Sequence, residues 1–217
     1  MGVTERRARE KEELRQGILA AATEMFANEG YESVSIRKIA DRIEYAPSTI
    51  YLYFKDKAEL IGTICEENFR LLNKALDALI GQGLPPLEML RSCLRAYIQF
   101  GLEHPNHYIV TFCLPDAKTH ELTPEEAARV LNEGLCTFAR LSRGLSECMD
   151  AGVISRANVE LTAQSTWMML HGVTSLLVTK SAFPFIDKAI LIEACLERIL
   201  LGLGAKISLT HPAELPL

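Results

Sequence analysis

The chain has 217 residues, of which 48% are hydrophobic and 24% charged, and its formal net charge is -5. These proportions are typical of a globular protein, and the length suits a small module attached to a larger body. The sequence contains no run of roughly 18 apolar residues that could span a membrane, and the charges in residues 1–13 are atypical of a signal peptide. We therefore expect a cytoplasmic protein with no membrane partner.

The negative charge is unevenly distributed along the chain. Residues 1–57 contain ten Lys or Arg and ten Asp or Glu, whereas residues 58–217 contain thirteen and eighteen. Because the acidic excess lies in the second segment, the first stays compatible with a nucleic-acid partner. The six cysteines form no Cys-x-x-Cys pair, which predicts free, mostly buried thiols instead of a zinc site or a disulfide framework.

Apolar residues recur with a period of about 3.6 from end to end, which predicts an all-α fold of about nine helices. Gly30 and the segment 81–86 are typical helix ends. The segments 56–59 and 123–126 each have the pattern of a capping box, which marks a helix start. The expected helices are one that ends at Gly30 and those over 35–42, 47–54, 56–80, 87–103, 106–114, 123–150, 159–179 and 187–203.

The helices expected over 35–42 and 47–54 have the lengths and the short intervening turn of a helix-turn-helix. Hydroxyl groups on the second helix would reach phosphates and base edges, lysines just beyond it would add positive charge, and an arginine on the first could reach a guanine. The residues that we expect to contact DNA are Ser35, Arg37, Pro47, Ser48, Thr49, Tyr51, Tyr53, Lys55 and Lys57.

The stretches 26–31, 39–40 and 48–60 resemble the TetR family of transcriptional regulators, of an AcrR-like kind. The resemblance implies that Pro47–Tyr53 is the recognition helix. It further implies that Thr49, Tyr51 and Lys57 bind phosphates, and that Arg37 and Ser48 read or position bases. A shorter pattern, Trp167-x-x-x-His171-Gly172, resembles the C-terminal domain of one TetR subgroup.

Two residues depart from the family pattern. Glu44 stands where the family usually has Gly, and Ala46 stands where Ser or Thr often caps the second helix. A glutamate in a left-handed turn costs on the order of 1 kcal/mol, and the missing cap costs about as much. We expect tertiary packing to hold this turn in place.

The remainder of the chain is predicted to form the body. We assign 1–57 to a helix-turn-helix DNA-binding domain and 58–217 to a helical effector-binding and dimerisation domain. The last two helices are apolar nearly all round, so a large core or a partner subunit must cover them, and the family resemblance implies a homodimer. The candidate effector pocket consists of Tyr97, Phe100, Tyr108, Phe112, Phe138, Trp167 and His171. The alternative for His171 is a core histidine that makes one hydrogen bond.

No nucleophile motif, paired carboxylates or phosphate-binding loop points to an enzyme, and no cofactor is predicted. His104 and His107 are separated by Pro105, which disfavours a helical metal site. The resemblance implies a repressor in the bacterial cytoplasm or nucleoid, bound to an approximately palindromic operator in double-stranded DNA and released by a small apolar effector. The alternatives are an activator on the same fold, or a helical ligand-binding or protein-interaction module that no longer reads DNA.

Overall fold

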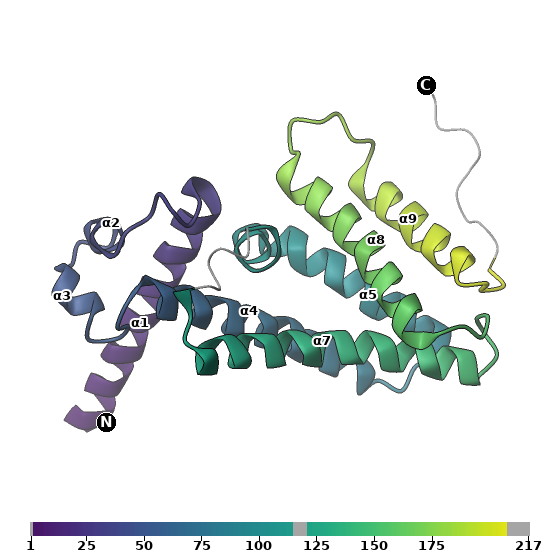
Figure 1. Ribbon diagram of the computed structural model, residues 1–217, viewed down its shortest axis with the longest axis horizontal. Helices are drawn as coiled ribbons and strands as arrows, with labels where there is room; N and C mark the ends of the chain where they lie inside the picture. The colour runs from purple at the N-terminus through teal and green to yellow at the C-terminus, as the bar shows by residue number, and fades with distance from the viewer. Residues whose placement is uncertain (1, 115–120, 208–217) are drawn as a thin grey trace. The chain divides into compact units, whose positions relative to one another are not determined.

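A computed structural model describes residues 2–114 and 121–207. Within these ranges the chain forms nine α-helices and one π-helical turn, η1, which confirms the all-helical prediction (Figure 1). None of the helices in the described ranges is long and apolar enough to cross a membrane. The helices are α1 (Val3–Glu29), α2 (Ile36–Arg42), α3 (Pro47–Ile50), α4 (Lys57–Ile80), α5 (Pro86–Glu103), α6 (Pro105–Tyr108) followed by η1 (Ile109–Cys113), α7 (Pro124–Asp150), α8 (Val159–Thr179) and α9 (Lys188–Gly202).

The described residues divide into two compact units. Unit 1 contains those of 1–70 and 106–133, and unit 2 those of 71–105 and 134–217. The division falls inside α4 and inside α7, so each of these helices contributes residues to both units.

Unit 1 is built around one hydrophobic core to which α1, α2, α3, the first part of α4 and η1 all contribute. Ile18 and Phe26 of α1 lie inside it and are fully buried. Ile39 of α2 and Ile50 of α3 are also fully buried, which anchors both short helices against α1. Burial of this apolar stripe, rather than helix propensity, holds such short helices in place.

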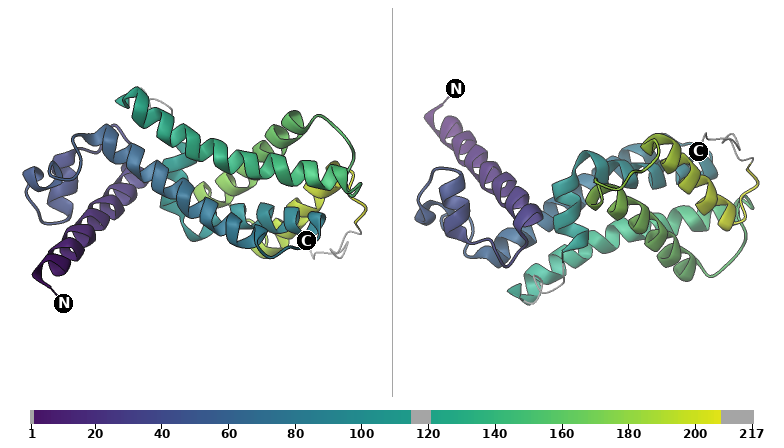
Figure 2. Two further views of the ribbon diagram at one scale, coloured as in Figure 1. Left: turned by 90° about the horizontal axis from the view of Figure 1, so that it is seen from below. Right: turned by 90° about the horizontal axis from the view of Figure 1, so that it is seen from above.

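In unit 2, α5 packs against α8 and α9, which also pack against each other (Figure 2). Leu94 and Ile98 of α5 and Leu196 of α9 are among the buried residues of this unit. The Arg95 guanidinium donates two hydrogen bonds to the Glu193 carboxylate, at 2.8 and 2.6 Å, and thereby links α5 to α9.

Two of the expected helices differ in detail. After Ile50 the chain tightens, because the Leu52 and Tyr53 amides donate to carbonyls only three residues back, at 3.2 and 2.9 Å. The helix expected over 47–54 therefore ends as an α-helix at Ile50. The helix expected over 106–114 widens into η1, where the Leu114 amide donates to the Ile109 carbonyl five residues back.

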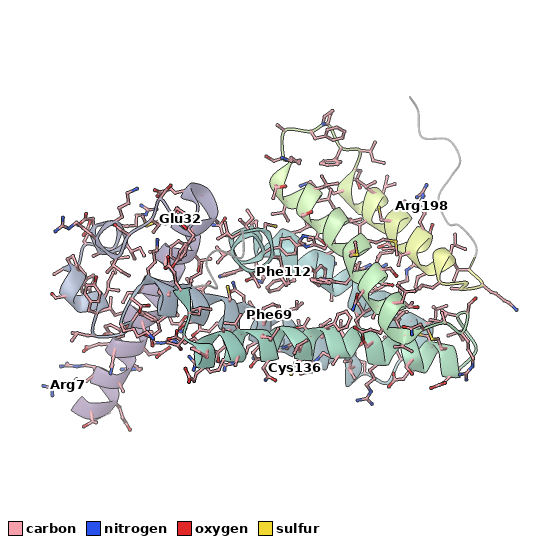
Figure 3. The ribbon with its side chains drawn as sticks, in the orientation of Figure 1. Arg7, Glu32, Phe69, Phe112, Cys136 and Arg198 are labelled. Atoms are coloured by element: carbon pink, nitrogen blue, oxygen red, sulfur yellow. The ribbon has the colours of Figure 1, made fainter. Side chains whose placement is uncertain are left out.

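The environments of the thiols correct one expectation. None of the six cysteines, all of which lie in the described ranges, forms a disulfide; only Cys65 and Cys148 are buried, and Cys136 is exposed on α7 (Figure 3). The sequence predicts mostly buried thiols, and this prediction is wrong for Cys136 and for the three partly buried cysteines. Burial raises the pKa of the Cys148 thiol to about 11, so this thiol stays protonated at neutral pH.

Candidate nucleic-acid interface

The helices α2 and α3 and the turn 43–46 between them form the predicted helix-turn-helix. Ser35 caps α2, its hydroxyl accepting a hydrogen bond from the Lys38 amide at 3.3 Å. The turn is closed by the Tyr45 amide, which donates to the Ala40 carbonyl at 3.0 Å. Glu44 has φ 60°, and within the described ranges it is the single residue other than glycine with positive φ. The left-handed conformation expected for Glu44 is therefore present.

The start of α3 lacks a side-chain cap. Ala46 occupies the N-cap position, and no side chain there accepts a hydrogen bond from the first turn. Pro47 follows at the first helical position, where its fixed φ favours helix initiation. Ile50, which is fully buried, then fixes the helix against the core. Tertiary packing thus compensates for the missing cap, as the sequence predicts.

Most of the predicted DNA-contact residues are accessible. Arg37 and Ser48 are exposed, and Pro47 and Thr49 are half-buried. The Tyr51 side chain is 55% exposed and that of its neighbour Leu52 is 79% exposed. The end of α3 therefore presents hydroxyl and apolar groups together, which are the groups that contact base edges and thymine methyls.

Tyr53 lies differently from Tyr51. It is half-buried and packs against the core of unit 1. The Lys11 ammonium lies 5.9 Å from the centre of its ring, a distance at which a cation and an aromatic face attract each other. Tyr53 therefore links α1 to the segment after α3.

Both predicted lysines have partners within unit 1. The Lys57 ammonium donates to the Tyr31 carbonyl at 3.1 Å and lies 3.9 Å from the centre of the Tyr31 ring. The Lys55 ammonium donates to Glu126 Oε1 at 2.6 Å. These intramolecular contacts could not be foreseen, because the partners are 26 and 71 residues away in the sequence.

Basic residues near the start of α1 were not singled out from the sequence. Arg6, Arg7, Arg9 and Lys11 are exposed, and the Arg7 side chain extends away from the helix (Figure 3). Arg6 forms an ion pair with Glu10 at 3.4 Å. Acidic residues are interspersed with these basic ones, a pattern that is equally typical of a solvent-exposed charged helix, so the sequence alone does not indicate a DNA contact here.

The residues of the predicted effector pocket fall into two groups. In unit 2, Trp167 Nε1 donates to the Tyr97 hydroxyl at 3.3 Å, and the ring centres of Phe138 and His171 each lie 6.4 Å from that of Trp167. Burial lowers the pKa of His171, which favours the neutral imidazole at neutral pH. Phe100, also of unit 2, is buried with its ring 5.3 Å from that of His104.

The other two residues, Tyr108 and Phe112, belong to unit 1. Their rings lie 5.0 Å apart, and Phe112 meets Phe69 of α4 edge to face at 5.3 Å (Figure 3). The Asn68 amide beside them donates to the Thr111 hydroxyl at 2.8 Å, which attaches η1 to α4. Among the described residues, no group of three His, Cys, Asp or Glu side chains is placed to hold a metal ion.

Comparison with known proteins agrees with this architecture. The family model described as "Bacterial regulatory proteins, tetR family" matches residues 18–64, and the model described as "Tetracyclin repressor-like, C-terminal domain" matches residues 90–201. The first match contains α2, the turn and α3, and the second contains α8 and most of α5 and α9.

Curated relatives match over shorter stretches. The chain is 30% identical over 95 residues to an uncharacterized HTH-type transcriptional regulator of Haemophilus influenzae, which is 44% of this chain and 51% of that protein. It is 32% identical over 78 residues, 36% of each chain, to the HTH-type transcriptional repressor KstR of Mycobacterium tuberculosis. The alignment thus spans about half the length of the first relative and about a third of the second.

Solved structures match over most of the chain. A tetR-family regulatory protein from Rhodococcus RHA1 superposes with a TM-score of 0.74 at 24% identity, covering 88% of this chain and 97% of that one. FadR from Bacillus subtilis, solved in complex with stearoyl-CoA, superposes with a TM-score of 0.72 at 22% identity, covering 87% and 98%. These likenesses show a common fold. With both family models matched and the helix-turn-helix formed, the chain belongs to the TetR family and is a DNA-binding transcriptional regulator, not an enzyme.

Proposed function

We propose that the chain acts as a homodimeric repressor that binds an approximately palindromic operator through α2 and α3 and is released by a small apolar effector. The observation that carries this proposal is the accessible end of α3, where Ser48, Tyr51 and Leu52 are all exposed beside a buried Ile50. The relative KstR is named a repressor, which supports that direction of regulation. A dimer would place two such heads about 34 Å apart, one helical turn of DNA.

The dimer is supported by an apolar stripe on α8. Leu161 and Met168 are each 70% exposed, and Leu176, farther along the same stripe, is 50% exposed. A Cβ placed on Gly172, between Met168 and Leu176, would meet nothing within 4 Å in this chain. Contiguous exposed apolar surface of this kind marks interaction sites, and a second copy of α8 would cover it.

The effector is assigned to the aromatic group of unit 2. Tyr97 is buried, Trp167 and Phe138 lie close to each other, and His171 is half-buried with its pKa lowered by burial. Such surroundings favour an apolar ligand with one hydrogen-bonding group. Because the similar FadR was solved with stearoyl-CoA, an acyl chain is the first ligand class to test. Release requires that the ligand bind the DNA-free conformation more tightly than the DNA-bound one.

The DNA-binding part is tested by selecting bound sites from a random duplex library at physiological salt. We expect one palindrome with half-sites about one helical turn apart. Tyr51→Ala should lose at least about tenfold in affinity for that palindrome, and Tyr51→Phe less, because it keeps the ring and removes only the hydroxyl. A folded wild-type dimer that enriches no site would instead favour the module that no longer reads DNA.

The dimer is tested by sedimentation velocity with Met168→Glu. The new carboxylate would have to be buried without a partner, so we expect a monomer with unchanged helicity. Leu135→Glu is the matched control, since Leu135 is a 55% exposed leucine on α7. If both variants dissociated to monomers equally, or if both remained dimers, pairing through α8 would be contradicted.

The effector class is tested by thermal unfolding with stearate, stearoyl-CoA and coenzyme A alone. Saturation to about 100 times the dissociation constant stabilises the folded state by about 2.7 kcal/mol. We expect both acyl compounds, but not coenzyme A, to raise the melting temperature and to release the selected duplex. The acyl class would be refuted if coenzyme A without an acyl chain raised the melting temperature and stearate did not, or if none of the three compounds raised it.

A further inference from the structure

The first turn of α7 and the residues just before it supply two carboxylates that contact the helix-turn-helix side of unit 1. Glu126 Oε1 accepts the hydrogen bond from the Lys55 ammonium at 2.6 Å. Glu121 Oε2 accepts one from the Tyr31 hydroxyl at 2.5 Å, and the Tyr31 carbonyl accepts one from the Lys57 ammonium at 3.1 Å. Of the two lysines predicted to bind DNA, Lys55 is therefore paired with a carboxylate of this chain, and Lys57 is bound to a backbone carbonyl.

Glu126 is fixed in place by a capping box. Its Oε2 accepts a hydrogen bond from the Thr123 amide at 2.8 Å, and its own amide donates to the Thr123 hydroxyl at 3.3 Å. The Glu126 side chain is only 9% exposed. The hydrogen bond from Lys55, followed by those from Thr123, lowers the pKa of Glu126, so the carboxylate is charged at neutral pH. This carboxylate cannot turn away without losing the hydrogen bond from the Thr123 amide.

Lys55 is fixed at its backbone but accessible at its side chain. Its amide donates to Glu59 Oε2 at 2.6 Å, in the first turn of α4. Its side chain is 49% exposed, so a phosphate can approach the ammonium. Any phosphate that did so would meet the Glu126 carboxylate on the same ammonium, and the two negative groups would repel each other.

We propose that Glu126 is an intramolecular competitor of the DNA backbone: it neutralises the Lys55 ammonium and so lowers the affinity of the DNA-binding unit for any duplex. The proposal rests on the contact between Lys55 and phosphate that belongs to the proposed function. A lysine already paired with a carboxylate displaces fewer condensed cations from DNA, so the pair removes one phosphate contact per protomer from the salt-dependent part of binding.

The test is the affinity for a mixed-sequence duplex, measured at several salt concentrations, because a phosphate contact is independent of base sequence. Glu126→Gln removes the charge and keeps the capping box, in which glutamine replaces glutamate. We expect roughly three- to tenfold tighter binding per protomer and a slope of log K against log salt that is steeper by about 0.9 per protomer. Glu125→Gln is the control, since Glu125 is an exposed glutamate in the same helical turn. It should change the affinity and the slope far less.

Lys55→Gln identifies the group that is released. Alone, it leaves the Glu126 carboxylate without its lysine partner and should weaken binding, whereas in the Glu126→Gln background it should abolish the gain. Unchanged or weaker binding by Glu126→Gln would overturn the proposal, and so would a gain that persists without Lys55. If the wild type fails to bind any duplex, the proposed DNA contacts fail as well; binding by the wild type with no gain in Glu126→Gln refutes the competitor alone.

Discussion

Replacing Glu44 by glycine should stabilise the protein, because it removes a left-handed glutamate from the turn between α2 and α3. Glu44 is exposed, and within the described ranges its side chain makes no hydrogen bond or ion pair. The substitution therefore loses no hydrogen bond or ion pair. What changes is the cost of φ 60°, which is high for a residue with a Cβ and negligible for glycine.

The expected gain follows from two opposing effects. A residue with a Cβ loses about 1–2 kcal/mol in the left-handed region. Glycine in turn lowers the free energy of unfolding by about 0.5–1 kcal/mol, because it loses more conformational entropy on folding. The net stabilisation is about 0.5–1 kcal/mol, which corresponds to a rise in melting temperature of about 1–4 °C for a chain of this length.

The control variant is Glu44→Ala, which removes the same charge and keeps the Cβ. Urea denaturation should give a higher midpoint for Glu44→Gly than for Glu44→Ala, with equal slopes. Both variants should gain equally in affinity for a mixed-sequence duplex, since both lose one negative charge. Equal midpoints, or a lower one for glycine, would refute the argument from backbone strain.

Three further predictions concern stability. Ala46→Ser should raise the free energy of unfolding by about 0.5–2 kcal/mol by capping α3, and an unchanged urea midpoint would contradict this. Tyr31→Phe should lower it by about 1 kcal/mol, since Glu121 loses its hydroxyl donor while the ring is kept; a wild-type midpoint would show that this bond contributes nothing. The hydrogen bonds from Arg95, and then from Arg91, lower the pKa of Glu193, so their stabilisation is present above the usual glutamate pKa and lost as pH falls through the folded-state value. Arg95→Met should therefore destabilise the protein at neutral pH and less in acid, which unfolding at both pH values would measure.

The long helices could be predicted because each carries enough apolar positions to define its period and has local signals at its ends. α8 shows this well: its bounds Val159–Thr179 are those expected, and the Asn158 side chain caps it by accepting from the Leu161 amide at 2.9 Å. The end of α3 could not be predicted in the same way. Packing of Ile50 and Phe54 into the core determines where the helix tightens.

The contacts of the candidate site were only partly predictable. The capping box of Thr123 and Glu126 is local, so the sequence reveals it. The second partner of Glu126 is Lys55, 71 residues away, and only the folded chain brings them together. A charged residue that is expected to bind DNA can therefore already be paired with another residue of the same chain. The left-handed conformation of Glu44 could be predicted, because this residue stands where the family usually has glycine.

The exposed α8 stripe and the DNA-binding helices belong to different units, which has a genetic consequence. Met168 and Leu176 belong to unit 2, whereas α2 and α3 belong to unit 1. Under the proposed pairing through α8, a mutant such as Tyr51→Ala, defective only in DNA binding, would still dimerise with wild-type chains. At equal expression, roughly one quarter of the dimers would then have two intact heads. Mutant alleles of this kind would be dominant, whereas mutations that prevent pairing would be recessive.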